Sequence, residues 1–262
     1  MSKIKGAALI TGASGRLGRA MAVDLAGLGH DIVIHHRSSA ADAEETAAAV
    51  REQGARAAIL QADLLDPDAV AGLVPAAVAA IGPLAILINN ASIFEHDTLE
   101  TATPESWHRH MGSNLYAPLF LSQAFAAQIS TGARDDRNER IASGVIVNMV
   151  DQRVRSLTPE FMTYTLAKYG LWGLTQTTAQ ALGPDIRVNA IGPGPTLPGE
   201  RQSVEHFVAQ RAATILERGP NLPDICAALR FILASQSLTG QLLCIDGGQH
   251  LAWETKDKLG TE

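Results

Sequence analysis

Three features that this sequence of 262 residues lacks limit the kinds of protein that it can be. It has no apolar run near the roughly 18 residues that a membrane-spanning helix needs, so we expect no membrane-embedded segment. It has no excess of basic residues, because 21 lysines and arginines face 27 acidic residues, and the net charge of −6 argues against a nucleic-acid or polybasic membrane surface. It has only two cysteines, Cys226 and Cys244, which we expect to be reduced in a cytoplasmic core.

Other features are absent as well. No group of histidine, cysteine and acidic residues has the spacing of a metal site, so no metal is expected. The N-terminal stretch MSKIKGAALITG runs from two lysines directly into a strand-like segment without a cleavage-like continuation, so we expect no signal peptide and a cytoplasmic location. With 46% apolar and 18% charged residues, the chain can form one large globular domain with a substantial core.

Short apolar strands alternate with helical patterns along the whole chain. This alternation predicts an α/β fold, a single doubly wound Rossmann domain over residues 1–262 in which a seven-stranded parallel sheet carries helices on both faces. The expected strands are AALIT (7–11), DIVIHH (31–36), AAILQ (57–61), LAILIN (84–89), GVIVNM (144–149), IRVNAI (186–191) and QLLCID (241–246).

The first expected strand runs into a glycine-rich turn, TGASGRLG (11–18). Gly12 allows a tight turn and Gly18 allows close helix packing, so a diphosphate can rest on the N-terminus of the next helix. The long cation Arg16 can reach both a cofactor phosphate and a ligand above it. The candidate cofactor-binding residues of this turn are Gly12, Ser14, Arg16, Leu17 and Gly18.

The second strand ends in the sequence His35-His36-Arg37-Ser38. A dinucleotide with a free ribose 2′-OH usually meets an acidic residue at this point, and none is present here. A guanidinium and a hydroxyl suit a 2′-phosphate instead. We therefore expect His36, Arg37 and Ser38 to favour NADP(H) over NAD(H).

The third and fourth strands end in further candidate cofactor contacts. In the pair Asp63-Leu64, the aspartate either accepts a hydrogen bond from an adenine amino group or caps the helix that begins near Asp66. After the fourth strand, small and amide side chains let the backbone approach a ribose. These residues are Asn90, Ala91 and Ser92.

Phe94 follows Ser92 in a loop that is too polar to be core. A flat aromatic ring near a nicotinamide would suit a planar heteroaromatic substrate by stacking. The alternative is that Phe94 anchors its loop by packing on a neighbouring residue.

The segment 104–129 is expected to form one long helix that is kinked at Pro118. Asn114 lies inside this apolar stretch and needs a polar partner. A buried water or a backbone carbonyl near Lys168 would satisfy it.

We assign no chemistry to three other stretches. Trp107, His108 and His110 are interpreted as helix surface or core. The mixed-charge loop 130–143 is expected to be solvated. The polar tail 252–262 is left unassigned.

The main candidate for chemistry is the stretch DQRVRSLTPEFMTYTLAK (151–168). Tyr164 and Lys168 are four residues apart in a helical segment, so they share one helix face. The ammonium is expected to lower the pKa of Tyr164 from about 10 toward the working pH, which would make Tyr164 a proton donor. Asp151 follows a buried strand, where a ligand crevice should open.

A rigid turn, Gly192-Pro193-Gly194-Pro195, follows the sixth strand. Its position at the carboxyl edge of the sheet should bring Pro193 and Gly194 to the nicotinamide. The stretch from about 195 to 217 is expected to be a lid over the substrate.

These motifs together resemble the short-chain dehydrogenase/reductase family over nearly the whole chain. The resemblance is carried by TGASGRLG, NNAS, Asn114, Tyr164-x-x-x-Lys168, RVNAIGPG and DGG. The family's serine, thirteen residues before the tyrosine, is replaced here by Asp151. Pteridine reductases have this aspartate. The sequence is also similar to them in TG-x-x-x-RLG, in the His-Arg-Ser end of the second strand, in the phenylalanine two residues after NNAS, in GSN-x-x-AP, in NMVD and in YT-x-AK.

The resemblance implies a catalytic set and a pterin site. The implied catalytic residues are Asn114, Asp151, Tyr164 and Lys168, in which Asn114 holds a water of a proton relay and Lys168 binds the nicotinamide ribose. The implied pterin-binding residues are Arg16, Ser92, Phe94, Asp151 and Tyr164, with the pterin ring between Phe94 and the nicotinamide. Family members are commonly tetramers with the Tyr164 helix in the interface, so a homotetramer is expected.

The chemistry agrees with this resemblance. Reduction of a C=N bond needs a hydride at carbon and a proton at nitrogen, and a carboxylate pairs with the adjacent N–H donors of an aminopyrimidine ring. We therefore expect an NADPH-dependent reductase that converts a dihydropterin to a tetrahydropterin. The alternatives are a short-chain reductase of another carbonyl or imine and a non-catalytic NADP(H) sensor.

Overall fold

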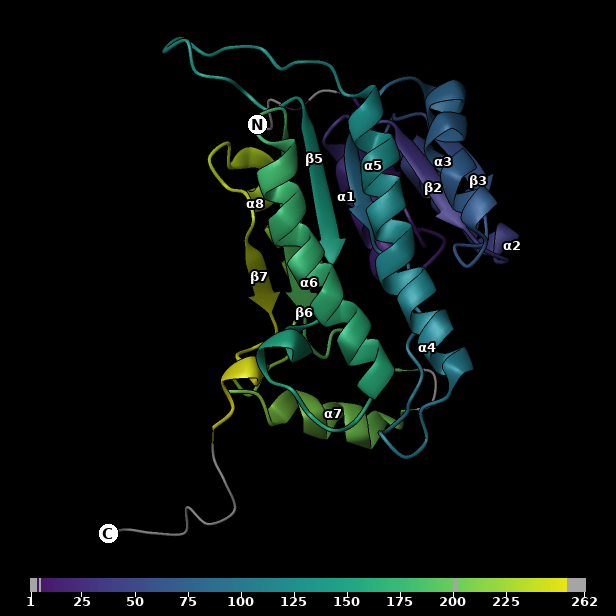
Figure 1. Ribbon diagram of the computed structural model, residues 1–262, viewed down its shortest axis with the longest axis vertical. Helices are drawn as coiled ribbons and strands as arrows, with labels where there is room; N and C mark the ends of the chain where they lie inside the picture. The colour runs from purple at the N-terminus through teal and green to yellow at the C-terminus, as the bar shows by residue number, and fades with distance from the viewer. Residues whose placement is uncertain (1–3, 5, 200–201, 254–262) are drawn as a thin grey trace.

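The strands form one parallel sheet of seven, as the sequence predicts. The computed structural model describes residues 4, 6–199 and 202–253. The strand order is β3-β2-β1-β4-β5-β6-β7, so the chain changes direction across the sheet between β1 and β4 (Figure 1). The strands are β1 (Ala7–Ile10), β2 (Ile32–His36), β3 (Ala57–Gln61), β4 (Leu84–Asn89), β5 (Gly144–Met149), β6 (Ile186–Pro193) and β7 (Leu242–Ile245). The predicted ranges agree with these to within two residues.

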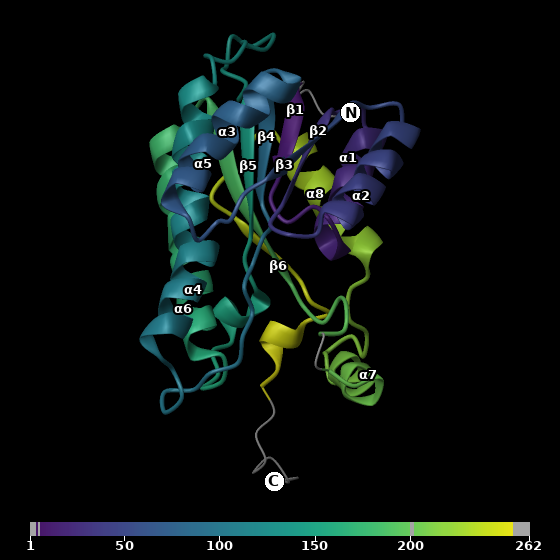
Figure 2. The same ribbon diagram turned by 90° about the vertical axis from the view of Figure 1, so that its right-hand side faces the viewer.

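Helices cover both faces of the sheet (Figure 2), and the fold class is confirmed. Helices α1, α2 and α8 pack on one face, and α3, α5 and α6 pack on the other. Because side chains alternate along a strand, Ala8 and Ile10 join the first core and Leu9 joins the second. The helices are α1 (Arg16–Gly27), α2 (Ala40–Glu52), α3 (Pro67–Ile81), α4 (Pro104–Met111), α5 (Ala117–Gln128), α6 (Met162–Leu182), α7 (Val204–Ala212) and α8 (Leu222–Ala234).

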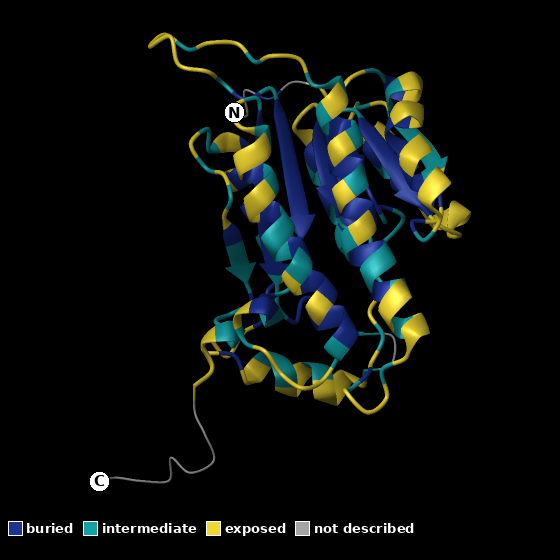
Figure 3. Ribbon diagram, in the orientation of Figure 1, coloured by how far each residue is buried: buried dark blue, intermediate teal, exposed yellow. Residues whose placement is uncertain are grey.

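The central strands are buried along their whole length (Figure 3). This burial explains why their sequences are nearly continuous apolar runs, since each strand faces a helix layer on both sides. No described helix is long and apolar enough to cross a membrane.

Side-chain caps fix where the helices begin. Asp66 accepts hydrogen bonds from the backbone N–H groups of Asp68 and Ala69, and Pro67 occupies the first position of α3. Since Asp66 caps this helix, the interpretation of Asp63 as its cap is wrong. Asp63 instead accepts a hydrogen bond from the backbone N–H of Leu65 within the preceding turn.

The segment from Pro104 to Gln128 is helical throughout, as expected, and its helical pattern changes just before Pro118. A π-helical turn, η1 (Gly112–Tyr116), joins α4 to α5. Pro118 has no N–H for the carbonyl of Asn114 four residues before it, so the regular α-helical pattern cannot continue there. The turn brings Asn114 next to the loop that follows β4.

The loop 130–143 is mostly exposed, as expected. Arg134 and Arg140 pair in an isolated antiparallel bridge. Asp185 holds the loop to the sheet by accepting hydrogen bonds from the backbone N–H of Gly132 and from the guanidinium of Arg140. Residues 254–262 of the unassigned tail lie outside the described residues.

Candidate active site

Asp151 and Tyr164 meet at the carboxyl edge of the sheet. The Tyr164 hydroxyl donates to Oδ2 of Asp151 over 2.9 Å, and the backbone N–H of Arg153 donates to Oδ1 of the same carboxylate over 2.8 Å. Asp151 begins the short helix η2 (Gln152–Arg155) directly after β5, and Tyr164 lies in the first turn of α6. The structure therefore joins the two side chains that the sequence singles out.

The pKa of Tyr164 lies well above its usual range, so the predicted direction is wrong. Burial raises it most, because Tyr164 is only 6% exposed and a phenolate would lose its hydration. The negative charge and the hydrogen bond of Asp151 raise it further, and the hydroxyl of Ser92 acts in the opposite direction. The sequence argument counted the ammonium of Lys168 but neither burial nor the carboxylate. Tyr164 is therefore a neutral hydroxyl that carries its proton.

Lys168 is buried beneath this pair. Its Nζ donates to the carbonyl of Met149 over 2.7 Å and lies 5.7 Å from the centre of the Tyr164 ring. Burial lowers the pKa of Lys168 to about 8, against the opposing effect of Asp151. The ammonium is thus close to its titration range at neutral pH.

Asn114 is completely buried and paired with one backbone unit. Its Nδ2 donates to the carbonyl of Ile93 and its Oδ1 accepts from the N–H of Ile93, both over 2.9 Å. The partner is a backbone group, as expected, but it belongs to the loop after β4 rather than to a group near Lys168. Asn114 therefore fixes the residue directly before Phe94.

The glycine-rich turn is packed so tightly that glycine is required at two positions. A Cβ on Gly18 would lie 2.3 Å from the carbonyl oxygen of Gly12 and 2.8 Å from Nδ2 of Asn90. Gly12 has a φ of 62° and its backbone N–H donates to Nδ1 of His35. Asn90 ties the turn to β4 by donating to the carbonyls of Thr11 and Gly12. Ala91 lies 3.0 Å from where a Cβ on Gly12 would be, so both residues shape the turn.

The N-terminus of α1 is open toward the carboxyl edge of the sheet. No side chain caps it at Gly15, and a Cβ added to Gly15 would meet nothing within 4 Å. Backbone N–H groups and a positive helix dipole at such an end bind anions. Ser14 lies beside this end, whereas Leu17 packs partly against the core. The turn therefore fits a dinucleotide diphosphate.

The end of β2 divides into buried and exposed residues. His35 is buried and structural, because its Nε2 faces the carbonyl of Ala62 and burial lowers its pKa to about 4. His36 is only 5% exposed, and its Nδ1 is buried without a partner among the described residues. Arg37 and Ser38 are exposed. The two surface residues are therefore a guanidinium and a hydroxyl, as a phosphate site requires.

The remaining candidates for cofactor contact lie at the same edge. Leu64 is buried in the core on the α3 side, so only its backbone is available to a ligand, whereas Asp63 is exposed. Gly194, after Pro193 at the end of β6, donates its N–H to Ile245, and a Cβ there would lie 2.6 Å from Cα of Asp246. Close approach of β7 therefore requires this glycine.

A family model described as short chain dehydrogenase matches residues 6–208. The chain belongs to the short-chain dehydrogenase family. Among solved structures it is similar to FolM, an alternative dihydrofolate reductase of Brucella suis in complex with NADP, with 42% identity, a TM-score of 0.89 and coverage of 97% of this chain and 98% of that chain.

Curated relatives of this short-chain dehydrogenase differ in the activities that they are named for. It is 33% identical to a probable galactose dehydrogenase of Rhizobium meliloti, over 92% of this chain and 93% of the relative. It is 29% identical to pteridine reductase 1 of Leishmania tarentolae, over 93% of this chain and 96% of the relative.

Phe94 of this short-chain dehydrogenase stacks on a residue that sequence reasoning missed. Its ring lies 4.5 Å from that of Phe161 at 8°, and 4.7 Å from the Tyr164 ring at 72°. The guanidinium of Arg153 lies over Phe161 at 4.8 Å. Phe94 therefore anchors its loop by packing on Phe161. Because the residue is still 52% exposed, this packing is compatible with stacking on a planar substrate. The sequence signal that could have indicated Phe161 is an aromatic residue three positions before Tyr164.

The segment expected to be a lid contains a short helix. Helix α7 lies beyond the carboxyl ends of the strands (Figure 1). Arg211 at its end donates to the carbonyls of Pro195, Gly219 and Pro220, which closes the segment on itself. Glu200 and Arg201 of the expected lid lie outside the described residues.

Arg16 connects this segment to the glycine-rich turn. Its Nη2 donates to the carbonyl of Pro198 over 3.2 Å, and its backbone has a φ of 53°, in the left-handed region that non-glycine residues rarely adopt. The cation is thus held between the N-terminus of α1 and the expected lid.

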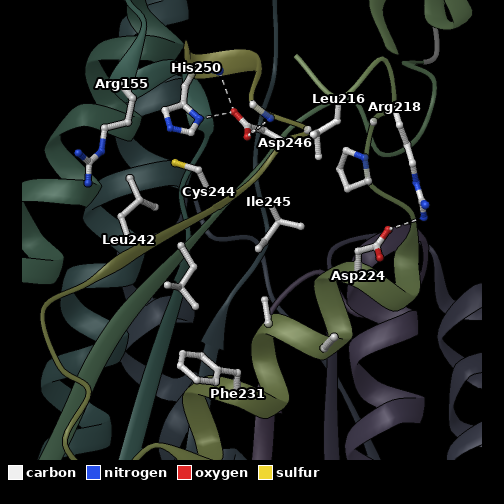
Figure 4. Close-up of a pocket in the computed structure, with 17 residues that line it drawn as sticks. Arg155, Leu216, Arg218, Asp224, Phe231, Leu242, Cys244, Ile245, Asp246 and His250 are labelled. Carbon is white, nitrogen blue, oxygen red and sulfur yellow. Dashed lines mark hydrogen bonds and ion pairs between the residues drawn. The ribbon is translucent and has the colours of Figure 1, made fainter. Parts of the chain in front are cut away.

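A cavity of about 920 Å³ lies elsewhere, along the outer edge of the sheet between β7 and α8 (Figure 4). None of the candidate catalytic residues lines it. The two cysteines are free, and burial raises the pKa of each thiol to about 11, so neither is a thiolate at neutral pH. Among the described residues no group of three histidine, cysteine or acidic side chains could hold a metal ion.

Proposed function

We propose that this short-chain dehydrogenase is an NADPH-dependent reductase that converts a dihydropterin to a tetrahydropterin. The observation that carries the proposal is the hydrogen bond from Tyr164 to Asp151, 2.9 Å long, beside the half-exposed ring of Phe94. A carboxylate, a phenol and a flat ring at one point suit a planar ring rich in N–H groups. The similarity to FolM and to a pteridine reductase supports the same substrate class.

The residues present fit NADP(H). The uncapped N-terminus of α1 would hold the diphosphate, and Arg37 and Ser38 would hold the 2′-phosphate. Lys168 would bind the nicotinamide ribose at the buried end of the site. NADPH, when bound, supplies the hydride that reduces the C=N carbon.

The protein's own residues hold and orient the proton and the substrate. The raised pKa of Tyr164 keeps its hydroxyl protonated at neutral pH. An aminopyrimidine edge that donates to Asp151 would replace Tyr164 as the partner of Oδ2, so that the phenol becomes free to donate to a ring nitrogen. Tyr164 would thus donate its proton to the ring nitrogen while Asp151 holds the ring, and the ammonium of Lys168 would stabilise the phenolate that remains.

The main alternative is reduction of another carbonyl or imine, which the similarity to a galactose dehydrogenase favours. The test is to mix the protein with NADPH and either dihydrobiopterin, dihydromonapterin or dihydrofolate, and to follow the nicotinamide absorbance. If NADPH is oxidised with ketones from a panel but with none of the pterins, the alternative is favoured. Tight NADPH binding with no turnover of any substrate would indicate a sensor.

We also propose that the protein is a homotetramer and that residues 195–217 form a lid over the substrate. Exposed apolar side chains on α5 and α6 support assembly, since Leu119, Leu166 and Tyr169 are 41%, 47% and 53% exposed. The link from Arg16 to Pro198 supports a lid that closes over the cofactor phosphates. The free thiols fit the reducing cytoplasm that we expect for this protein.

A further inference from the structure

A buried polar cluster connects the loop that carries Phe94 to the helix that carries Tyr164. Its members are Asp97 in the loop after β4, Ser106 and His110 on α4, and Thr163 in the first turn of α6. Asp97, His110 and Thr163 are 3%, 0% and 3% exposed. Polar groups this deeply buried must satisfy one another, so the cluster has a defined pattern of donors and acceptors.

Asp97 caps α6 from a distant part of the chain. The helix begins after Phe161, whose φ of 57° is left-handed and whose side chain makes no cap. Asp97 accepts at Oδ1 from the backbone N–H of Thr163 over 3.1 Å, and its own carbonyl accepts from the N–H of Met162 over 3.2 Å. Its Oδ2 accepts from the hydroxyls of Thr163 and Ser106 over 2.5 and 3.0 Å. Burial opposes the charge of Asp97, but these hydrogen bonds outweigh burial and lower its pKa.

His110 continues this pattern in one direction. Its Nε2 lies 3.1 Å from the backbone N–H of Glu95, which can only donate, so Nε2 must be an unprotonated acceptor. The ring proton is then on Nδ1, which donates to Oγ1 of Thr163 over 2.7 Å, and the Thr163 hydroxyl donates to Asp97. The chain of hydrogen bonds is closed only when His110 is neutral and carries its proton on Nδ1.

The two ends of this chain adjoin the residues of the proposed reaction. Glu95 directly follows Phe94, and Thr163 directly precedes Tyr164. The rings of Phe94 and Tyr164 are 4.7 Å apart, and the His110 ring lies 6.0 Å from that of Tyr164 at 74°. A change at His110 would therefore act on Phe94 through Glu95 and on Tyr164 through Thr163.

We propose that His110, Thr163 and Asp97 are positioning residues that hold Phe94 and Tyr164 at the spacing needed to receive the substrate ring. This proposal rests on the proposed function for the chemistry at Tyr164. None of the three residues acts on the substrate directly. They act through a fixed histidine tautomer that joins two segments distant in the sequence.

The charged groups around His110 set what acid does to this chain. Glu95 and Asp97 from the loop after β4, and Arg109 from its own helix, influence the ring, and Thr163 and Tyr164 face it from α6. Burial lowers the pKa of His110, while Asp97 and Glu95 oppose that effect. Protonation of Nε2 would set an N–H against the N–H of Glu95, so acid should release the residue next to Phe94.

The test compares Thr163→Val with Thr163→Ser. Valine has nearly the same shape as threonine but no hydroxyl, so it breaks the chain at its centre, whereas serine keeps the hydroxyl. Histidine ring NMR with ¹⁵N labelling reports the tautomer, and the His110→Gln spectrum assigns the signal. We expect Nδ1–H for His110 at pH 7 in the wild type and in Thr163→Ser, and a changed tautomer or pKa in Thr163→Val.

Kinetics supply the second readout. In Thr163→Val the kcat for dihydropterin reduction should fall about 10- to 100-fold, as for a misplaced donor, with the KM for NADPH unchanged, and Thr163→Ser should keep most of the rate. An Nε2–H tautomer in the wild type, or a Thr163→Val protein with wild-type tautomer and kcat, would overturn the inference. If Thr163→Val does not fold, the tautomer of His110 in the wild type still tests the inference, since Nδ1–H supports it and Nε2–H overturns it. If the wild type reduces no pterin, the proposed function fails, while the NMR result still tests the cluster separately.

Discussion

The hydroxyl of Tyr164 donates to Oδ2 of Asp151 over 2.9 Å. Thirteen residues separate them in the sequence, and the relatives of the wider family that the sequence resembles carry a serine at the position of Asp151. A serine is a neutral donor and acceptor, whereas the carboxylate accepts only and raises the pKa of the phenol. This pair therefore distinguishes the site chemically from one that has a serine at position 151.

Replacing Asp151 by serine should restore the wider family's residue and remove the charged acceptor for the N–H groups of a pterin ring. We expect kcat/KM for dihydropterin reduction to fall about 100-fold, which is the usual contribution of a positioned acid or base. Affinity for NADPH, measured by fluorescence titration, should change little. Asp151→Asn is the matched control, because it keeps the shape but can offer an N–H where the ring also donates. Full pterin activity in both variants would argue against the proposed role.

Replacing Arg37 by alanine should weaken NADPH much more than NADH. A hydrogen bond to a charged group contributes about 1.5–3 kcal/mol, so the Kd for NADPH should rise at least tenfold. Arg37→Lys keeps the positive charge and should lose less. Calorimetric titration of both cofactors measures the difference. An equal loss for NADPH and NADH would contradict the assignment of the 2′-phosphate site.

The buried Lys168 should make stability rise with pH. Its pKa is about 8 in the folded chain and 10.5 for the ordinary group, so between these values the unfolded chain binds one more proton. The buried ammonium therefore lowers the free energy of unfolding below pH 8. This penalty decreases as the pH rises from about 8 to 10.5. From pH 7.5 to 9.5 the wild type should gain roughly 2 kcal/mol relative to Lys168→Met in urea titrations. A pH-independent difference between the two proteins would show that Lys168 is not desolvated.

The exposed apolar face of α6 should be an assembly surface. Light scattering should give a mass about four times the 27.7 kDa of one chain. Tyr169→Asp places a charge on this face and should shift the protein to smaller species. Ala41→Asp, at an exposed position of α2, is the control and should keep the wild-type mass. A monomeric wild type, or equal behaviour of both variants, would exclude α6 as the interface.

Much of the fold follows from local patterns. The seven strands are recognisable because a strand buried on both faces must be apolar at nearly every position. The glycine-rich turn is recognisable because Gly12 and Gly18 lie between a strand-like run and a helical pattern. The pair Tyr164 and Lys168 is recognisable because helical spacing alone puts both on one face. Each of these inferences needs only neighbouring residues.

The tertiary structure decided what depends on burial and on distant partners. The pKa of Tyr164 moves upward, not downward, because the fold removes water from the phenol and brings Asp151 against it. Phe161 joins the site because its ring meets Phe94 from another loop, and His110 gains its tautomer from Glu95 and Thr163, the latter 53 residues away. Sequence spacing determines which residues share a helix or a strand, but desolvation and hydrogen-bond direction depend on contacts that only the packed chain creates.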